Sequence, residues 1–160
     1  MGSLILELMT FIEIVTCQMP DRPCLKAPQW QPVIHQVSAE NLFYIHRGQG
    51  AQYAGTTNFI PYALYFNEFI YLKTNWSREN PGDLSAMVHE LTHYMQEQNG
   101  ISYKCEGDRE RLAYEVQEAF LKERFNGMSV YEATGTHILV QIGHMWCDQP
   151  NLAKPWEPGY

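Results

Sequence analysis

Apolar side chains recur at the spacing of an amphipathic helix along three stretches of this 160-residue chain. These stretches cover residues 1–17, 81–98 and 108–125. Within each, the apolar positions follow one another at intervals of three or four residues, which places them on one side of a helix. A fourth stretch, residues 130–147, is also expected to be helical, although Gly135 and Gly143 weaken it. The pattern therefore predicts four helices.

Strands are predicted in three shorter segments. Residues 33–37 alternate between apolar and polar side chains, as a half-buried strand does. The runs 62–66 and 69–72 are rich in aromatic residues, which favour strands. Asn67-Glu68 between these two runs indicates a tight hairpin turn. We therefore expect a small antiparallel or mixed sheet.

Two segments have no clear period. Residues 41–53 contain Gly48 and Gly50 and are ambiguous. Residues 150–160 contain three prolines and are predicted to be an irregular tail. The length fits one domain, residues 1–160. The fold class that follows is α+β, with the sheet packed on the second and third predicted helices.

Composition argues against two kinds of partner. The net charge is −7 and the 11 Lys and Arg residues are scattered, whereas binding to phosphates needs clustered basic residues, so nucleic acid is not expected. No apolar run reaches the ~18–20 residues of a membrane span.

The apolar start of the chain carries Glu7 and Glu13 and has no basic region, so it does not resemble a signal peptide. Whether a leader peptide was removed is left open. The oligomeric state is also open.

The segment His89-Glu90-Leu91-Thr92-His93 is an H-E-x-x-H motif within the second predicted helix. Histidines four residues apart project from one side of a helix, so both imidazoles can reach one metal ion. Glu90 would lie beside that ion, where it can take a proton from a metal-bound water. Helical phase places both histidines opposite the apolar side of the helix. The motif predicts a zinc-dependent hydrolase; the alternative is two surface histidines on an amphipathic helix.

A catalytic zinc ion usually has a third protein ligand. The third predicted helix offers Glu110, Glu115 and Glu118, and Glu106 precedes it. Helical phase puts Glu110 at the margin of the core side, whereas Glu115 and Glu118 lie on the side expected to be solvated. Because a ligand must point toward the neighbouring helix, we predict Glu110, with Glu115 and Glu106 as alternatives.

An H-E-x-x-H helix followed by E-x-x-A on a second helix resembles the gluzincins, zinc peptidases with a glutamate as third ligand. Here the second run is Glu110-Arg111-Leu112-Ala113-Tyr114. Several of those families have an acid in the place of Tyr114, and that acid supports a zinc-binding histidine. Since the acid is missing, Tyr114 or Gln117 is expected to take its role.

The chain also resembles small bacterial proteins that share HELxHxxQ, a cysteine and E-x-x-A-Y-x-x-Q. These correspond to residues 89–96, Cys105 and residues 110–117, and the resemblance covers about residues 34–147. It implies a zincin-like fold and peptidase activity. In zincins a sheet edge beside the H-E-x-x-H helix binds substrate in extended form, so one of the aromatic-rich strands is expected to be that edge.

The four cysteines allow two disulfides. We favour pairing Cys105 with Cys147 and Cys17 with Cys24, and four reduced thiols are the alternative. Bonded pairs would favour an extracytoplasmic or secreted protein, and reduced thiols a cytoplasmic one. The spacing of the cysteines does not favour a role in binding zinc.

The sequence thus predicts a peptidase that acts on a peptide or protein substrate with one Zn²⁺ ion. The expected ligands are His89, His93 and Glu110. Glu90 is the expected general base. Candidates for stabilising the oxyanion are Tyr114, His137 and His144. The alternatives are a zinc-binding module without catalysis and a metal-free binding protein.

Overall fold

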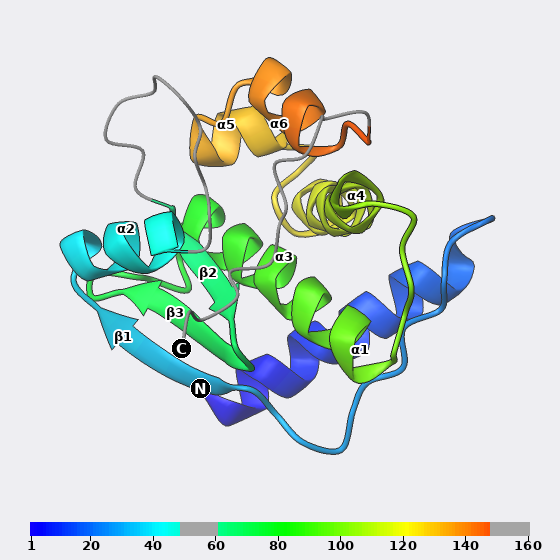
Figure 1. The fold of residues 1–160 in the computed structure, drawn as a ribbon, viewed down its shortest axis with the longest axis horizontal. Coiled ribbons are helices and arrows are strands. Elements are labelled where there is room, and N and C mark those ends of the chain that lie inside the picture. Colours follow the sequence, from blue (N-terminus) through cyan, green and yellow to red (C-terminus); the bar gives the residue numbers. More distant parts are fainter. Residues whose placement is uncertain (49–60, 148–160) are drawn as a thin grey trace, which may run out of the picture.

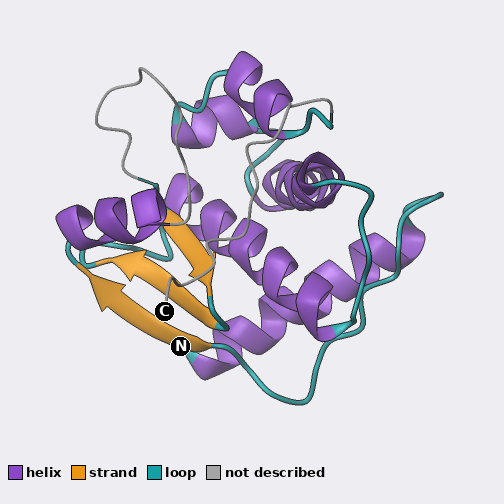
Figure 2. Cartoon of the chain, viewed as in Figure 1, coloured by secondary structure: helices purple, strands orange, loops and turns teal. Residues whose placement is uncertain are grey.

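In the computed structural model, which describes residues 1–48 and 61–147, the chain forms helices and a three-stranded sheet (Figure 1). The elements are α1 (Gly2–Gln18), β1 (Val33–Val37), α2 (Ala39–Gly48), β2 (Ala63–Phe66), β3 (Phe69–Lys73), α3 (Pro81–Gln98), α4 (Glu106–Arg124), α5 (Val130–Thr134) and α6 (Ile138–His144). Figure 2 shows the sheet at one side of the molecule and helices over the rest. The described part is therefore mixed α+β, as the sequence predicts.

The central strand of the sheet is β3. It pairs with β1 in parallel and with β2 antiparallel, so the sheet is mixed and β2 forms one edge. Asn67 and Glu68 have φ angles of 49° and 68°. Two successive positive φ angles are typical of the type I′ turn that joins hairpin strands. The three predicted strands and the hairpin are thus confirmed.

Helix α3 lies in the interior of the fold. It packs against β2 on one side and against α4 on another, and α1 crosses it (Figure 1). Thirteen of its 18 residues are buried, among them His89 and His93. The alternative interpretation of these two as surface histidines is therefore wrong. The apolar side of α3 contributes to a core that also contains Leu8, Ile70 and Phe120.

The ends of α3 follow the local sequence. The side chain of Asn80 accepts a hydrogen bond of 3.0 Å from the backbone N–H of Asp83, and Pro81 is the first helical residue. Past the other end, Gly100 has a φ of 61°, in the left-handed region that glycine enters without strain. The predicted helix is confirmed, and α4 begins two residues before its predicted start.

Two segments differ from the expectation. Residues 130–147 do not form one helix, because Gly135, with a φ of 72°, ends α5 in the left-handed conformation before α6 begins. The ambiguous segment 41–53 is helical up to Gly48, and its remainder lies outside the described residues, as does the predicted tail 150–160. Within the described ranges, no helix has both the length and the apolar character needed to cross a membrane.

Both favoured cysteine pairs are bonded. Disulfides join Cys17 to Cys24 and Cys105 to Cys147, so the alternative of reduced thiols is wrong. The second bond ties the residue before α4 to the segment after α6, over a sequence separation of 42. Paired cysteines are compatible with a location outside the cytoplasm.

The two disulfides are expected to stabilise the fold unequally. Replacing Cys105 and Cys147 by serine should lower the free energy of unfolding by about 4 kcal/mol, whereas replacing Cys17 and Cys24 should lower it by about 2.5 kcal/mol. The difference follows from loop length, since the longer loop loses more conformational entropy in the unfolded chain. Urea unfolding of both double variants measures it, and an equal or reversed order would contradict the expectation.

Candidate metal centre

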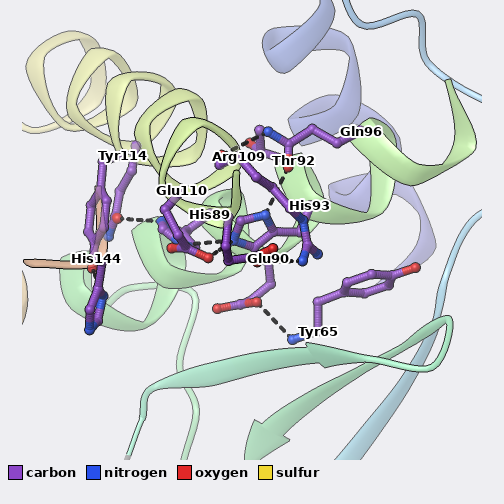
Figure 3. Close-up of polar contacts among 12 residues, drawn as sticks. Tyr65, His89, Glu90, Thr92, His93, Gln96, Arg109, Glu110, Tyr114 and His144 are labelled. Atoms are coloured by element: carbon purple, nitrogen blue, oxygen red, sulfur yellow. Dashed lines mark hydrogen bonds and ion pairs between the residues drawn. The ribbon is translucent and has the colours of Figure 1, made fainter. Parts of the chain in front are cut away.

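Three metal-binding side chains converge between α3 and α4 (Figure 3). Helix α3 supplies His89 and His93, one turn apart, and α4 supplies Glu110. The Nε2 atoms of the two histidines are 3.1 Å apart. Glu110 places Oε2 3.3 Å from Nε2 of His89, and Oε1 3.1 Å from Nε2 of His93. The residues predicted as ligands are therefore brought together.

The spacing of these atoms fits one tetrahedral ion. Nitrogen and oxygen ligands at about 2.0–2.1 Å from zinc lie about 3.3 Å from one another in a tetrahedron. The two Nε2 atoms are 3.1 Å apart, and each lies 3.1–3.3 Å from a different oxygen of the Glu110 carboxylate. Two imidazoles and a carboxylate are ligands that suit zinc. These three residues are a group that could hold a divalent metal ion.

The charges of the cluster are strongly coupled. Burial favours the neutral form of Glu110, but the charges and hydrogen bonds of His93 and His89 outweigh it and hold the Glu110 pKa well below its ordinary value. Burial favours neutral His89 as well, yet hydrogen bonding and attraction to Glu110 raise the His89 pKa. Glu110 therefore carries the negative charge that a cation requires.

Each histidine is also held from its other ring nitrogen. Nδ1 of His89 is 3.1 Å from Oε1 of Gln117, and Nδ1 of His93 is 2.9 Å from Oε1 of Gln96. Because an amide oxygen only accepts, Nδ1 of each ring is the donor in these contacts, and Nε2 is the nitrogen that faces the cluster. Of the two residues expected to support a histidine, Gln117 contacts Nδ1 of His89. The role of Gln96 was not predicted, although its spacing of three residues from His93 was visible in the sequence.

Glu90 lies between the cluster and the edge of the sheet (Figure 3). Its Oε2 accepts a hydrogen bond of 2.7 Å from the backbone N–H of Tyr65 in β2. Burial raises the pKa of Glu90, and the charges of His89 and His93 oppose that effect. The Glu90 carboxylate is therefore oriented by a backbone group of strand β2.

A pocket of about 280 Å³ opens at the cluster. Its lining includes His89, Glu90, His93 and Glu110, with Ala63 to Tyr65 of β2 on one side and α5 and α6 on another. The ring of Tyr114 lies 4.7 Å from that of His89, and its hydroxyl is 3.0 Å from Nδ1 of His144. Burial lowers the pKa of His144, which favours the neutral imidazole. Two of the three oxyanion candidates thus face the cluster.

The remaining candidates are not part of the cluster. His137 accepts a hydrogen bond from the backbone N–H of Leu139 at the start of α6 and does not line the metal pocket. Glu115 forms an ion pair with Arg22. Glu106 lines the metal pocket, but its carboxylate pairs with Arg109. His46 was not predicted as a site residue, yet it lines the pocket, and burial lowers its pKa. Its element, α2, lies in the segment that the sequence left ambiguous.

Comparison with known proteins assigns the chain to a family but not to an activity. The chain belongs to the family described as Domain of unknown function (DUF6647), whose model matches residues 7–137. This range includes all three residues of the metal cluster and Glu90. No curated protein and no solved structure matches the chain.

Removal of Glu110 tests the cluster. Glu110→Ala should weaken zinc binding by more than about 100-fold, because it deletes a ligand. Loss of a residue that only supports a ligand has a smaller effect. Glu115→Ala, on the same helix, removes the same charge and should leave zinc affinity unchanged. Competition with a chromophoric chelator measures both. Equal losses in the two variants would mean that Glu110 is not the third ligand.

Proposed function

We propose that this protein is a zinc-dependent peptidase of the gluzincin kind, with a zincin-like fold. The proposed ligands are His89, His93 and Glu110, and Glu90 is the proposed general base. The observation that carries the proposal is the position of Glu90, which lies in one pocket with the three ligands and is hydrogen-bonded to the edge strand β2. A metal site with only a structural role has no need for this arrangement.

Zinc held by His89, His93 and Glu110 would lower the pKa of a water molecule and polarise the substrate carbonyl. Glu90 then accepts the proton of the attacking water and passes it to the leaving amine. The hydrogen bond from the backbone N–H of Tyr65 keeps the carboxylate oriented while the proton is transferred. Because that donor belongs to a paired strand, it is itself held in place by the sheet.

The edge of β2 suits an extended peptide. In the antiparallel ladder the residues of β2 alternate, and Tyr65 directs its N–H to Glu90 and thus away from β3. The same alternation turns the main-chain groups of Ala63 away from β3. A substrate strand that pairs with this edge would pass the cluster with its backbone in reach of Glu90. This supports a peptide or protein as the substrate.

Tyr114 and His144 form a pair of which one member is the proposed donor to the oxyanion. Both line the metal pocket, and they are joined by the contact of 3.0 Å between the hydroxyl and Nδ1. When the hydroxyl donates to Nδ1, the neutral ring carries its proton on Nε2; when Nδ1 donates, the hydroxyl proton is the one that can be donated onward. A preorganised donor of this kind stabilises the charge that develops on the substrate carbonyl oxygen.

The exchange of Glu90 tests the mechanism. Glu90→Gln should lower hydrolysis of a mixed peptide library by at least about 10²–10⁴-fold, because it removes the proton acceptor. Zinc content should not change. Glu97→Gln, two turns further along α3, removes the same charge and should remain active. Mass spectrometry of the library with and without a chelator is the measurement, and a fully active Glu90→Gln variant would rule the assignment out.

The role of His144 is tested separately. His144→Ala should lower kcat by about 10²–10³-fold with little change in KM, since the contact forms only as charge develops on the oxygen. His137→Ala is the control, because His137 lies at the start of the same helix but does not line the metal pocket. We expect this variant to have the kcat of the wild type. If the two variants lose kcat to the same extent, the effect comes from α6 as a whole and not from the imidazole of His144.

A further inference from the structure

Two buried glutamines, Gln96 and Gln117, support the two ligand histidines. Their exposed fractions are 1% and 3%. Each directs its amide oxygen at an Nδ1 atom, at 2.9 Å for His93 and at 3.1 Å for His89. A neutral amide thus stands where many zinc histidines have a carboxylate. The partner of a histidine sets the basicity of the imidazole as well as its orientation.

The orientation of both amides is fixed by their second contacts. Nε2 of Gln96 donates to the carbonyl of Arg109 at 2.9 Å, and a carbonyl cannot donate in return. Nε2 of Gln117 donates to Oγ of Ser85 at 3.2 Å, and this hydroxyl donates to the carbonyl of Gly82 at 3.2 Å. Both chains of hydrogen bonds therefore run from a histidine to a backbone carbonyl, so neither amide can be reversed without losing a bond.

We propose that Gln96 and Gln117 are positioning residues that tune the metal through His89 and His93. They hold each imidazole with its proton on Nδ1, and as neutral acceptors they donate less electron density to the ring than a carboxylate would. An ion held by these histidines would then keep more of its positive charge and would be bound less tightly. This inference rests on the metal site of the proposed function, and it does not depend on which bond is hydrolysed.

The two chains of hydrogen bonds should respond differently when the glutamine is replaced by glutamate. In Gln117→Glu the new oxygen faces the hydroxyl of Ser85, which can rotate and donate to it. In Gln96→Glu the new oxygen would face the carbonyl of Arg109 at 2.9 Å, and two acceptors repel each other. A carboxylate should therefore be accepted beside His89 and rejected beside His93. A simple effect of added negative charge would instead be the same at both positions.

Zinc affinity measured by chelator competition is the main test. Gln117→Leu should weaken zinc binding by about 10–100-fold, and Gln117→Glu should bind about tenfold more tightly than the wild type. Gln96→Glu should bind more weakly than the wild type. The control is Thr92→Val, which removes a buried hydrogen bond to Val88 on the same helix and should leave affinity unchanged. If both glutamate variants tighten binding, or if Gln117→Leu does not weaken it, the proposal is wrong.

A second measurement needs neither activity nor metal. The protons on Nδ1 of His89 and His93 should give slowly exchanging signals in the proton–nitrogen NMR spectrum, because both donate to buried acceptors. Gln117→Leu should remove the His89 signal and keep that of His93. Loss of both signals or of neither would overturn the positioning role. A wild-type protein that binds zinc with these properties but cleaves no peptide would contradict only the peptidase proposal.

Discussion

The meeting of one carboxylate with two imidazoles across the α3–α4 interface is the interaction on which the rest of the site depends. Glu110 lies 3.1–3.3 Å from His89 and His93 in largely buried surroundings. Polar groups that are taken from water need partners, or they cost several kcal/mol. The apolar contacts of the same two helices, which include Leu91 and Leu112, keep these partners in register. Packing thus supports the polar cluster, and a cation is its natural complement.

Helical phase is the reason that much of this site could be predicted from the sequence. The side on which a residue lies depends only on its spacing from neighbours in the same helix, so Glu110 could be separated from Glu115. The structure places Glu110 at the cluster and Glu115 against Arg22. The strands could also be predicted, because the alternation of apolar and polar residues is a local pattern. Capping residues, which are also a local signal, located both ends of α3 at Asn80 and Gly100.

Other features depend on contacts between distant segments and could not be derived in this way. The sequence left open which aromatic-rich strand forms the edge, because strand order is set by packing across the sheet. Gln117 was only one of two candidates for supporting a histidine, and Gln96 was not considered. The break at Gly135 was underestimated, since a glycine inside a helical pattern lowers helix propensity without fixing the end. Each of these results is set by tertiary structure.

Helix α4 orders both sides of the pocket at once. It carries Glu110, and it also contacts the end of α6. Gly107 packs so closely there that a Cβ atom would lie 2.7 Å from the carbonyl oxygen of Met145. Arg111 donates a hydrogen bond to the same oxygen. The Cys105–Cys147 disulfide closes the same contact covalently. A shift of α4 would therefore move the proposed third ligand and His144 together. Because one helix places both, the position of Glu110 relative to His144 depends on how α4 packs against α6 and not on the sheet.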